Sequence, residues 1–483
     1  MLTLNNPALL RTECYLNGEW VTADTGDTLS VTNPATGKII ATVPACSAAQ
    51  TRAAIDGAAL AQPDWRKRTA AARAKVLHAW HQLILAHQED LAQLMTAEQG
   101  KPLAEARGEI AYAAAFIQWF AEEGKRTYGD VIPSPFPNSR IVVIKEPVGV
   151  CAAITPWNFP TAMITRKVAP ALAAGCAMVV KPAEQTPLSA LALAVLAEQA
   201  GIPAGIFNVI TGDPRVIGGE LTANEKVRKL SFTGSTAVGR LLMQQCAPTL
   251  KKLSLELGGN APFIVFDDAD LDAAVAGAMA SKYRNSGQTC VCANRFLVQA
   301  SVYNAFAEKL AQAVTTLKVG HGTEVDVTQG PLIDEAALCK VESLIADAVA
   351  GGANILNGGR RHALGGTFYV PTVLTNVLPT MRVAKEEIFG PVAPLFKFET
   401  EAEAIQMAND TEFGLAAYVY ARDIGRVWRV SEALEYGMVG INSGVISTEV
   451  APFGGQKSSG LGREGSKYGI DEYMEIKYLH MGL

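Results

Sequence analysis

Short apolar runs alternate with longer Ala- and Leu-rich segments along most of the chain. The apolar runs are typical of buried strands, and the segments between them are typical of helices. Expected strands cover residues 140–145, 150–155, 177–181, 207–210, 229–233, 252–257, 263–266 and 295–299, and expected helices cover 187–200, 235–246, 269–283 and 301–316. This alternation predicts parallel α/β sheets. It resumes after Gly258–Gly259 and continues to about residue 440, which predicts a second α/β unit with these glycines as the hinge.

The amino-terminal quarter has a different pattern. The first 60 residues combine short β-like runs with turn signals such as Asn17–Gly18. Residues 68–97 and 101–123 are rich in Ala, Leu and Gln, which predicts two long helices. The Gly-Lys-Pro junction separates them, and Pro102 suits the first turn of the second helix.

Composition and charge exclude several classes of function. The 483 residues are 49% apolar and 18% charged, which is a globular composition. A net charge of −5 provides no electrostatic footprint for nucleic acid or for an anionic membrane. The longest apolar run, residues 168–180, contains Pro170 and is too short to span a bilayer, and the first residues lack the pattern of a signal peptide. Eight cysteines without disulfide-type spacing favour a reducing, cytoplasmic setting.

Two of these cysteines, Cys290 and Cys292, follow a polar Gly-Gln-Thr turn. No second cysteine pair or spaced histidine pair accompanies them, so no metal is expected. One interpretation is a buried cysteine that packs as a small apolar side chain, which fits Cys151 and Cys176 better than Cys290. The other is a thiolate stabilised by backbone N–H groups of the turn, and therefore a nucleophile.

Three other stretches place polar residues at expected strand ends. Asn158, in the Pro-Trp-Asn-Phe-Pro stretch 156–160, offers either a donor for an oxyanion or a helix cap. Gly234 and Ser235 lie at a strand-to-helix turn that suits phosphate, although a plain turn and cap is the more economical interpretation. Glu256 lies in an apolar strand, where burial would raise its pKa and suit a general base, unless the side chain turns to solvent.

Seven motifs in order extend across essentially the whole chain. They are P-W-N-F-P (156–160), K-P-A-E (181–184), F-T-G-S-T-A-V-G (232–239), L-E-L-G-G (255–259), G-Q-T-C (287–290), E-E-I-F-G-P-V (386–392) and P-F-G-G-Q-K-S-S-G-L-G-R-E-G (452–465). Together they resemble the aldehyde dehydrogenase superfamily, and R-N-S-G-Q-T-C-V-C-A-N-R is most similar to its succinate-semialdehyde dehydrogenases.

The resemblance implies an α/β fold with three parts. An NAD(P)-binding domain is expected over 1–125 and 148–257, and a catalytic domain over 258–445. A small β oligomerisation arm is expected over 126–147 and 466–483, in a homodimer or homotetramer.

The resemblance also implies a role for each motif. Cys290 is the expected nucleophile, Glu256 the base that activates water, and Asn158 with the Cys290 backbone N–H the oxyanion hole. The expected dinucleotide contacts are Ile154, Thr155, Pro156, Trp157, Lys181, Ala183, Glu184, Gly212, Phe232, Gly234, Ser235, Leu257, Glu387 and Phe389. The distal carboxylate of a small-molecule semialdehyde is expected at Arg166, Arg284, Ser447 and Phe453, unless the arginines form ordinary surface ion pairs.

These roles imply the oxidation of succinic semialdehyde to succinate through a thiohemiacetal and a thioester on Cys290. Glutaric semialdehyde is the alternative substrate, because one methylene distinguishes substrates by only about 1–3 kcal/mol. Glu184 would accept both ribose hydroxyls of NAD and repel a 2′-phosphate, so NAD is expected to be preferred, with NADP as the alternative cofactor.

Other interpretations remain at this point. A thiol hydrolase without redox chemistry, a non-enzymatic relative and a dehydrogenase of uncharged aldehydes are the rival functions. Cys292 is expected to pack, to tune the thiolate, or to form a strained and reducible disulfide with Cys290 that switches the enzyme off.

Overall fold

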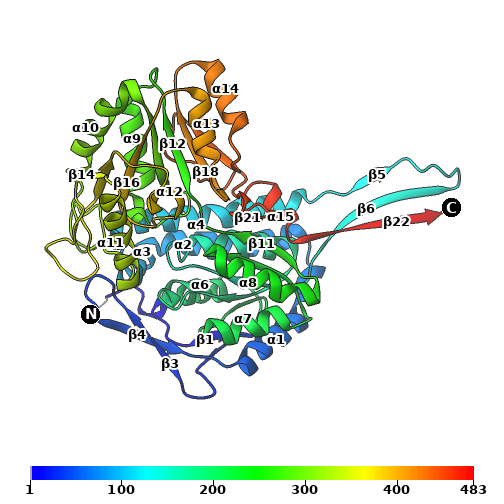
Figure 1. The fold of residues 1–483 in the computed structure, drawn as a ribbon. Coiled ribbons are helices and arrows are strands. Elements are labelled where there is room, and N and C mark those ends of the chain that lie inside the picture. Colours follow the sequence, from blue (N-terminus) through cyan, green and yellow to red (C-terminus); the bar gives the residue numbers. More distant parts are fainter. Residues whose placement is uncertain (1–2) are drawn as a thin grey trace.

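Two mostly parallel β-sheets organise the computed structural model, which describes residues 3–483 (Figure 1). The first sheet has the strand order β2-β1-β9-β8-β7-β10-β11-β21. Its central parallel strands are β7 (Val150–Ile154), β8 (Ala177–Lys181), β9 (Phe207–Val209), β10 (Val227–Thr233) and β11 (Lys252–Glu256). Antiparallel strands close its edges: β1 (Cys14–Leu16), β2 (Glu19–Val21) and β21 (Gly460–Leu461).

The second sheet has the strand order β14-β15-β16-β13-β12-β18-β19. Its strands are β12 (Ala261–Val265), β13 (Ala293–Gln299), β14 (Asn354–Asn357), β15 (Thr372–Thr375), β16 (Val392–Phe398), β18 (Ala416–Tyr420) and β19 (Met438–Ile441). Only the edge strand β14 is antiparallel to its neighbour. The chain passes from the first sheet to the second between Glu256 and Ala261. The predicted α/β fold with parallel sheets is confirmed.

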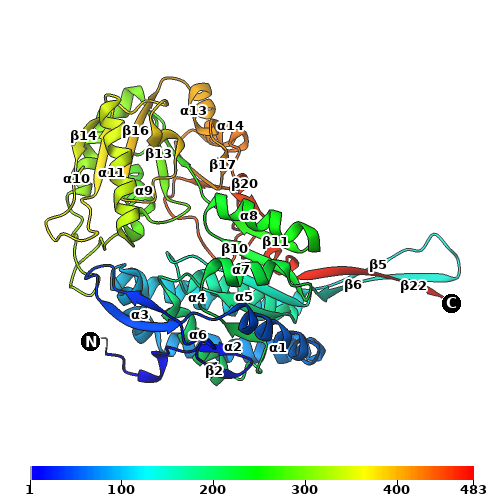
Figure 2. The same cartoon turned by 60° about the horizontal axis from the view of Figure 1, so that its bottom comes forward.

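Helices cover both sheets (Figures 1 and 2). Those around the first sheet are α1 (Ala48–Lys67), α2 (Ala70–Ala86), α3 (Gln88–Gln99), α4 (Leu103–Glu123), α5 (Ala162–Ala174), α6 (Pro187–Gln199), α7 (Pro214–Ala223) and α8 (Thr236–Cys246). Those around the second are α9 (Leu271–Lys282), α10 (Tyr303–Val314), α11 (Glu335–Ala350), α12 (Arg382–Lys385), α13 (Glu401–Asn409) and α14 (Ile424–Ala433). Because helices cover both faces, strands such as β8 and β12 are buried at every position, which explains their continuous apolar runs.

Two predictions for the amino-terminal quarter are wrong. Residues 48–67 form helix α1 instead of short β-like runs, and a capping box between Ser47 and Gln50 starts this helix. The single helix predicted over 68–97 is two helices, α2 and α3, because His87 lies between them with a non-helical backbone (φ −108°, ψ 20°). The second predicted helix, 101–123, corresponds to α4.

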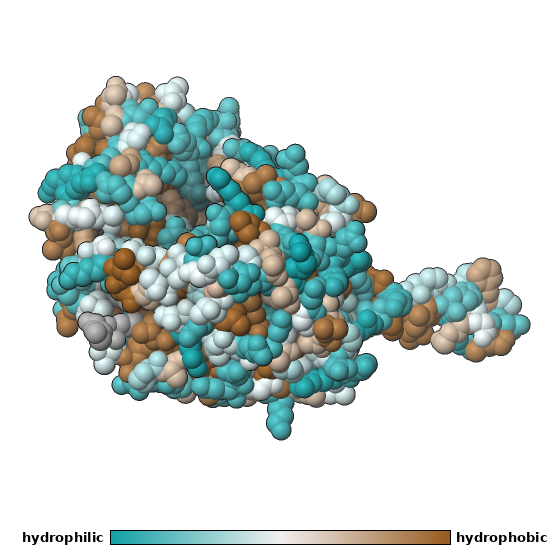
Figure 3. All heavy atoms as spheres, turned by 90° about the horizontal axis from the view of Figure 1, so that it is seen from below, coloured by the Kyte–Doolittle hydropathy of each residue, from teal (hydrophilic) through white to brown (hydrophobic). Residues whose placement is uncertain are grey.

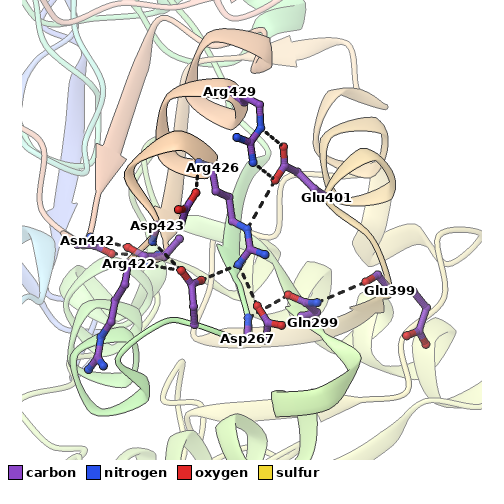
Figure 4. A network of polar contacts seen from close by, with 11 residues as sticks. Asp267, Gln299, Glu399, Glu401, Arg422, Asp423, Arg426, Arg429 and Asn442 are labelled. Atoms are coloured by element: carbon purple, nitrogen blue, oxygen red, sulfur yellow. Dashed lines mark hydrogen bonds and ion pairs between the residues drawn. The ribbon is translucent and has the colours of Figure 1, made fainter.

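Ion pairs between charged side chains tie α13 and α14 to the end of β12 (Figure 4). Arg426 on α14 donates to Asp267 at 2.9 Å and to Asp268 at 2.7 Å. Arg429, one turn later, pairs with Glu401 on α13 at 2.8 Å. Exposed pairs of this kind contribute about 0–1 kcal/mol each, so they order the surface more than they stabilise it.

A three-stranded antiparallel arm projects from the body (Figures 1 and 2). It consists of β5 (Asp130–Ile132), β6 (Ser139–Pro147) and β22 (Met474–Gly482), and β22 pairs with β6 along its whole length. Apolar side chains on the arm are exposed, among them Val131 at 79% and Ile476 at 73%, and Figure 3 shows apolar atoms on this projection. Exposed apolar surface of this kind is typical of interaction sites.

Among residues 3–483, no helix combines the length and the apolar character that crossing a membrane requires.

Candidate active site

A cavity of about 570 Å³ lies where the carboxyl ends of the first sheet face the second unit. Parallel sheets carry their ligands at this edge. Residues from both units line the cavity, and most of the predicted site residues are among them: Pro156, Trp157, Asn158, Arg166, Gly234, Ser235, Glu256, Leu257, Arg284, Cys290, Glu387, Phe389, Ser447 and Phe453. The structure therefore brings together residues that lie up to about 300 positions apart in the sequence.

Cys290 lies in the cavity at the end of a strained turn. Asn285 and Ser286 have left-handed backbone angles (φ 51° and 54°), and a side chain at Gly287 would meet the Gly390 carbonyl at 2.2 Å. Burial raises the pKa of the Cys290 thiol to about 12, although Arg166 opposes the shift. The resting thiol is therefore neutral at pH 7, and the sequence-based interpretation of a thiolate stabilised by the turn does not describe this state.

Asn158 is held beside this turn. Its side-chain Nδ2 donates to the Gln288 carbonyl at 2.9 Å, which leaves the second N–H of the amide for another acceptor. The alternative role as a helix cap is wrong, because α5 begins only after Thr161 and the carboxylate of Glu109 accepts its first amides at 3.0 and 3.2 Å. Asn158 is consequently free to offer a donor toward the cavity.

Sequence reasoning missed the residues that position Asn158. Lys101, from the junction between α3 and α4, donates to the Asn158 carbonyl oxygen at 2.8 Å and pairs with Glu109 at 2.5 Å. Both side chains are 1% exposed. Asn285 Nδ2 donates to the same carbonyl at 3.0 Å and thereby links it to the cysteine turn. The Gly-Lys-Pro junction was the available signal, and its lysine suggested nothing more than a helix boundary.

Glu256 ends strand β11 and points into the cavity. The residue is 3% exposed, so it does not turn to solvent, and neither carboxylate oxygen accepts a hydrogen bond from the described residues. Burial, reinforced by nearby Glu464, raises the pKa of Glu256 well above its usual value. A carboxylate with these properties is suited to accept a proton from a thiol or from water.

Glu464 is the second group that sequence reasoning missed, although it lies inside the last motif. It forms ion pairs with Lys167 and, at 2.8 Å, with Arg166. Burial opposes its ionisation, but these two cations hold the pKa of Glu464 below its usual value. The pair also shows that Arg166 is a buried residue at 1% exposure, so the surface ion pair considered for it is wrong.

Two arginines, Arg166 and Arg284, line the cavity. The Arg166 guanidinium lies 3.9 Å from the centre of the Phe453 ring; its Nη2 is held by Glu464, and its Nε donates no hydrogen bond to residues 3–483. Arg284 lies 5.4 Å over the Phe159 ring. Ser447 lines the same space. Guanidinium groups with unused donors in an enclosed cavity suit a carboxylate.

The remaining predicted cofactor residues follow the carboxyl edge of the first sheet. Ile154 and Thr155 end β7, and the Thr155 amide donates to the Lys181 carbonyl at 3.1 Å. Lys181 ends β8, and its Nζ pairs at 2.7 Å with Glu184, two residues beyond Pro182 and next to Ala183. The residues predicted for the adenosine end therefore follow the carboxyl ends of the neighbouring strands β7 and β8, and we call this row of residues the strip.

Glycines allow the backbone of this strip to lie very close to neighbouring groups of the protein. Gly212 has φ 150°, and a side chain there would meet the Cys46 carbonyl at 2.9 Å. A side chain at Gly234 would meet the Phe232 ring at 2.4 Å. Ser235 caps α8, so the plain cap is present, and the same helix amino terminus remains suited to phosphate.

The second unit contributes the far end of the strip. Glu387 accepts the Gly259 amide at 3.1 Å, and burial raises its pKa to about 7. Phe389 lies edge-on to Trp157 with 5.6 Å between ring centres. A side chain at Gly258, which follows Leu257, would meet Glu387 at 2.9 Å. The close backbone approaches at the three glycines, the amino terminus of α8 and the facing rings of Trp157 and Phe389 fit an extended dinucleotide.

Cys292 is buried and turned toward a different partner. Its Sγ donates to the Lys282 carbonyl at 3.2 Å, and its amide donates to the Thr289 carbonyl at 3.2 Å. These contacts favour packing, and the disulfide switch with Cys290 stays a prediction. Within residues 3–483, no cluster of three or more His, Cys, Asp or Glu side chains has the arrangement of a metal site.

Comparison with known proteins agrees with this geometry. The aldehyde dehydrogenase family profile matches residues 20–479. A glutarate-semialdehyde dehydrogenase of Pseudomonas aeruginosa is 64% identical over 481 residues, and the NADP(+) succinate-semialdehyde dehydrogenase of Escherichia coli is 64% identical over 482 residues, with all of both chains covered in each case. The crystal structure of a succinate-semialdehyde dehydrogenase from Burkholderia pseudomallei superposes with a TM-score of 0.99 at 67% identity, again over 100% of both chains.

The chain therefore belongs to the aldehyde dehydrogenase family. It is an aldehyde dehydrogenase that uses a pyridine-nucleotide cofactor, and the predicted enzyme class is confirmed. Its high identity to named semialdehyde dehydrogenases places it among the relatives of these enzymes.

Proposed function

We propose that this enzyme oxidises succinic semialdehyde to succinate. The observation that carries the proposal is the pair of guanidinium groups, Arg166 and Arg284, that share one cavity with Cys290. The Arg284 guanidinium, the unpaired Nε of Arg166 and the polar Ser447 in the same cavity suit the distal carboxylate of the substrate, while the aldehyde lies at the thiol. The names of the relatives support the semialdehyde class and include both the four-carbon and the five-carbon substrate.

Each of the catalytic residues in the cavity has a separate role in the proposed reaction. Glu256 is a base for the neutral Cys290 thiol, whose sulfur then bonds to the aldehyde carbon to give a thiohemiacetal. The free N–H of Asn158 and the Cys290 backbone N–H stabilise the negative oxygen. The pyridine nucleotide supplies a hydride acceptor when bound. Loss of hydride from the thiohemiacetal carbon leaves the acyl group on Cys290 as a thioester. Glu256 then activates a water that hydrolyses this thioester and releases the acid.

The dinucleotide is expected along the strip from Lys181 and Glu184 to Glu387. Glu184 would bind the ribose hydroxyls and disfavour a 2′-phosphate, so we propose NAD as the preferred cofactor. The ion pair with Lys181 neutralises part of the Glu184 charge, and we therefore expect the preference to be small, with NADP also used. The comparison of kcat/KM for NAD and NADP, in wild type and in Glu184→Ser, tests this: the variant gains NADP use, and a wild-type preference for NADP contradicts the assignment.

Chain length is tested with a panel of substrates. NADH formation is followed with semialdehydes of three to six carbons. The proposal predicts the highest kcat/KM for succinic semialdehyde. A higher value for glutaric semialdehyde would replace the four-carbon substrate with the five-carbon one, and the difference is expected to be modest because a methylene is worth only about 1–3 kcal/mol.

We also propose that the projecting arm joins copies of the chain into a homodimer or homotetramer. The exposed apolar side chains of β5 and β22 support this, because they would be covered by a partner. Light scattering after size exclusion measures the mass. Deletion of residues 474–483 is expected to lower the assembly state, and an unchanged mass would contradict the role of the arm.

A further inference from the structure

Tyr112 on helix α4 lies in the same cavity as the two arginines, and neither the motifs nor the proposed mechanism uses it. Its hydroxyl oxygen is buried and has no hydrogen-bond partner among residues 3–483. An unpaired buried hydroxyl costs about 1–3 kcal/mol, so such groups are normally satisfied by a ligand or by water. The position of this hydroxyl in a ligand cavity makes a ligand the natural partner.

The surroundings of Tyr112 place it at the substrate end. Its ring packs edge-on against Phe116 at 4.9 Å and contacts the small apolar cluster that includes Met163 and Phe159. The same side chains contact the two guanidinium groups. Arg166 donates to the Met163 sulfur at 3.6 Å and lies 5.6 Å over Phe116, while Arg284 lies 5.4 Å over Phe159.

The charges around this hydroxyl favour an anionic ligand. Burial raises the pKa of Tyr112, so the phenol is a neutral O–H donor at pH 7. The carboxylates nearby are already engaged: Glu105 accepts the Asn285 amide at 2.8 Å, and Glu109 pairs with Lys101. Glu256, whose oxygens are unpaired, is the base assigned to Cys290, so the open groups around Tyr112 itself are donors.

We propose that Tyr112 is a specificity-determining residue whose O–H donates a hydrogen bond to the distal acid group of the substrate, beside Arg166 and Arg284. The inference rests on the proposed function, because it needs a substrate with an acid group at this end. The phenol adds direction to the site: the arginines supply charge, and one oriented donor fixes one oxygen of the acid group. Substrates without that group gain nothing from it.

The test is the Tyr112→Phe variant, which removes one oxygen and keeps the ring. The exposed Tyr128→Phe is the matched control. Steady-state kinetics are measured with succinic semialdehyde and with butanal, which carries a methyl group in place of the carboxylate. We expect kcat/KM for succinic semialdehyde to fall about tenfold or more, mainly through KM, because the lost bond has a charged acceptor. The value for butanal, the control variant and the thermal midpoint stay unchanged.

Each outcome decides between named alternatives. An equal loss for both aldehydes shows a structural role and overturns the inference, and no loss for either shows that water satisfies the hydroxyl. If wild type does not prefer succinic semialdehyde over butanal, the proposed function itself fails. If wild type has this preference and Tyr112→Phe keeps it in full, the proposed function stands and only the role of Tyr112 is overturned. Calorimetric binding of succinate, weaker in the variant, provides a readout that does not depend on turnover.

Discussion

Arg284 is the substrate-binding candidate whose removal disturbs the protein least. Its guanidinium forms no hydrogen bond or ion pair with another side chain in the described part of the chain, and it lies 5.4 Å over the Phe159 ring. Arg166, in contrast, is paired with buried Glu464. Replacement of Arg284 by Met therefore removes donors for the substrate and leaves no buried charge unpaired.

The expected size of the effect follows from the lost bonds. Hydrogen bonds to charged groups are worth about 1.5–3 kcal/mol each, and a guanidinium fork can make two to one carboxylate. A loss of about 3 kcal/mol corresponds to about 100-fold in kcat/KM, since 1.4 kcal/mol is tenfold. We expect Arg284→Met to show this loss with succinic semialdehyde and no loss with butanal.

The assay follows NADH absorbance at saturating cofactor, and urea unfolding accompanies it. Arg166→Met is the comparison: it is expected to lose activity and also about 3 kcal/mol of stability, because it breaks a buried ion pair. Unchanged kinetics of Arg284→Met with succinic semialdehyde would refute the carboxylate-binding role. An equal loss with butanal would refute it as well, because the arginine would then act on the cysteine turn.

Three further results are expected. Glu256→Gln should slow single-turnover NADH formation as well as steady-state turnover, each about 100-fold or more, since Glu256 is the base for the Cys290 thiol and for the water; a burst of about one NADH per active site at the wild-type rate would show that Glu256 acts only on the water. With the pKa of Cys290 raised to about 12, the thiolate fraction increases up to tenfold per pH unit, so single-turnover NADH formation should rise from pH 6 to 9, and a flat profile would indicate a thiolate already present at neutral pH. Peroxide inactivation should be reversed by dithiothreitol equally in wild type and in Cys292→Ala, as packing predicts; reversal in wild type alone would establish the disulfide switch.

The fold could be predicted from the sequence wherever a segment carried a single clear pattern of apolar and polar residues. Buried parallel strands such as β8 and β12 are continuous apolar runs, and their alternation with helices was visible in the sequence. Helix α1 was missed because Gly57 and Pro63 interrupt a helix that packing against β8 and α7 stabilises. The break at His87 also has a signal, because Glu89 and Asp90 in the first turn of α3 favour a new helix start.

The active site also contains residues that the sequence allows to be predicted and residues that it does not. Residues at strand ends, such as Asn158 and Glu256, were accessible because parallel strands bring their carboxyl ends together. The partners that set their properties were not accessible. Lys101 reaches Asn158 across 57 residues, and Lys167 reaches Glu464 across 297. Such contacts exist only after segments far apart in the sequence have packed together, and no periodicity or spacing encodes them.

The central claim is that the cavity selects an aldehyde by the acid group at its far end. The most direct test is the ratio of kcat/KM for succinic semialdehyde to kcat/KM for butanal in the wild-type enzyme. Two arginines that bind the carboxylate predict a ratio of about 100 or more, from at least two charge-assisted hydrogen bonds of about 1.5 kcal/mol each. A ratio near or below one would contradict the claim and would assign the enzyme to uncharged aldehydes.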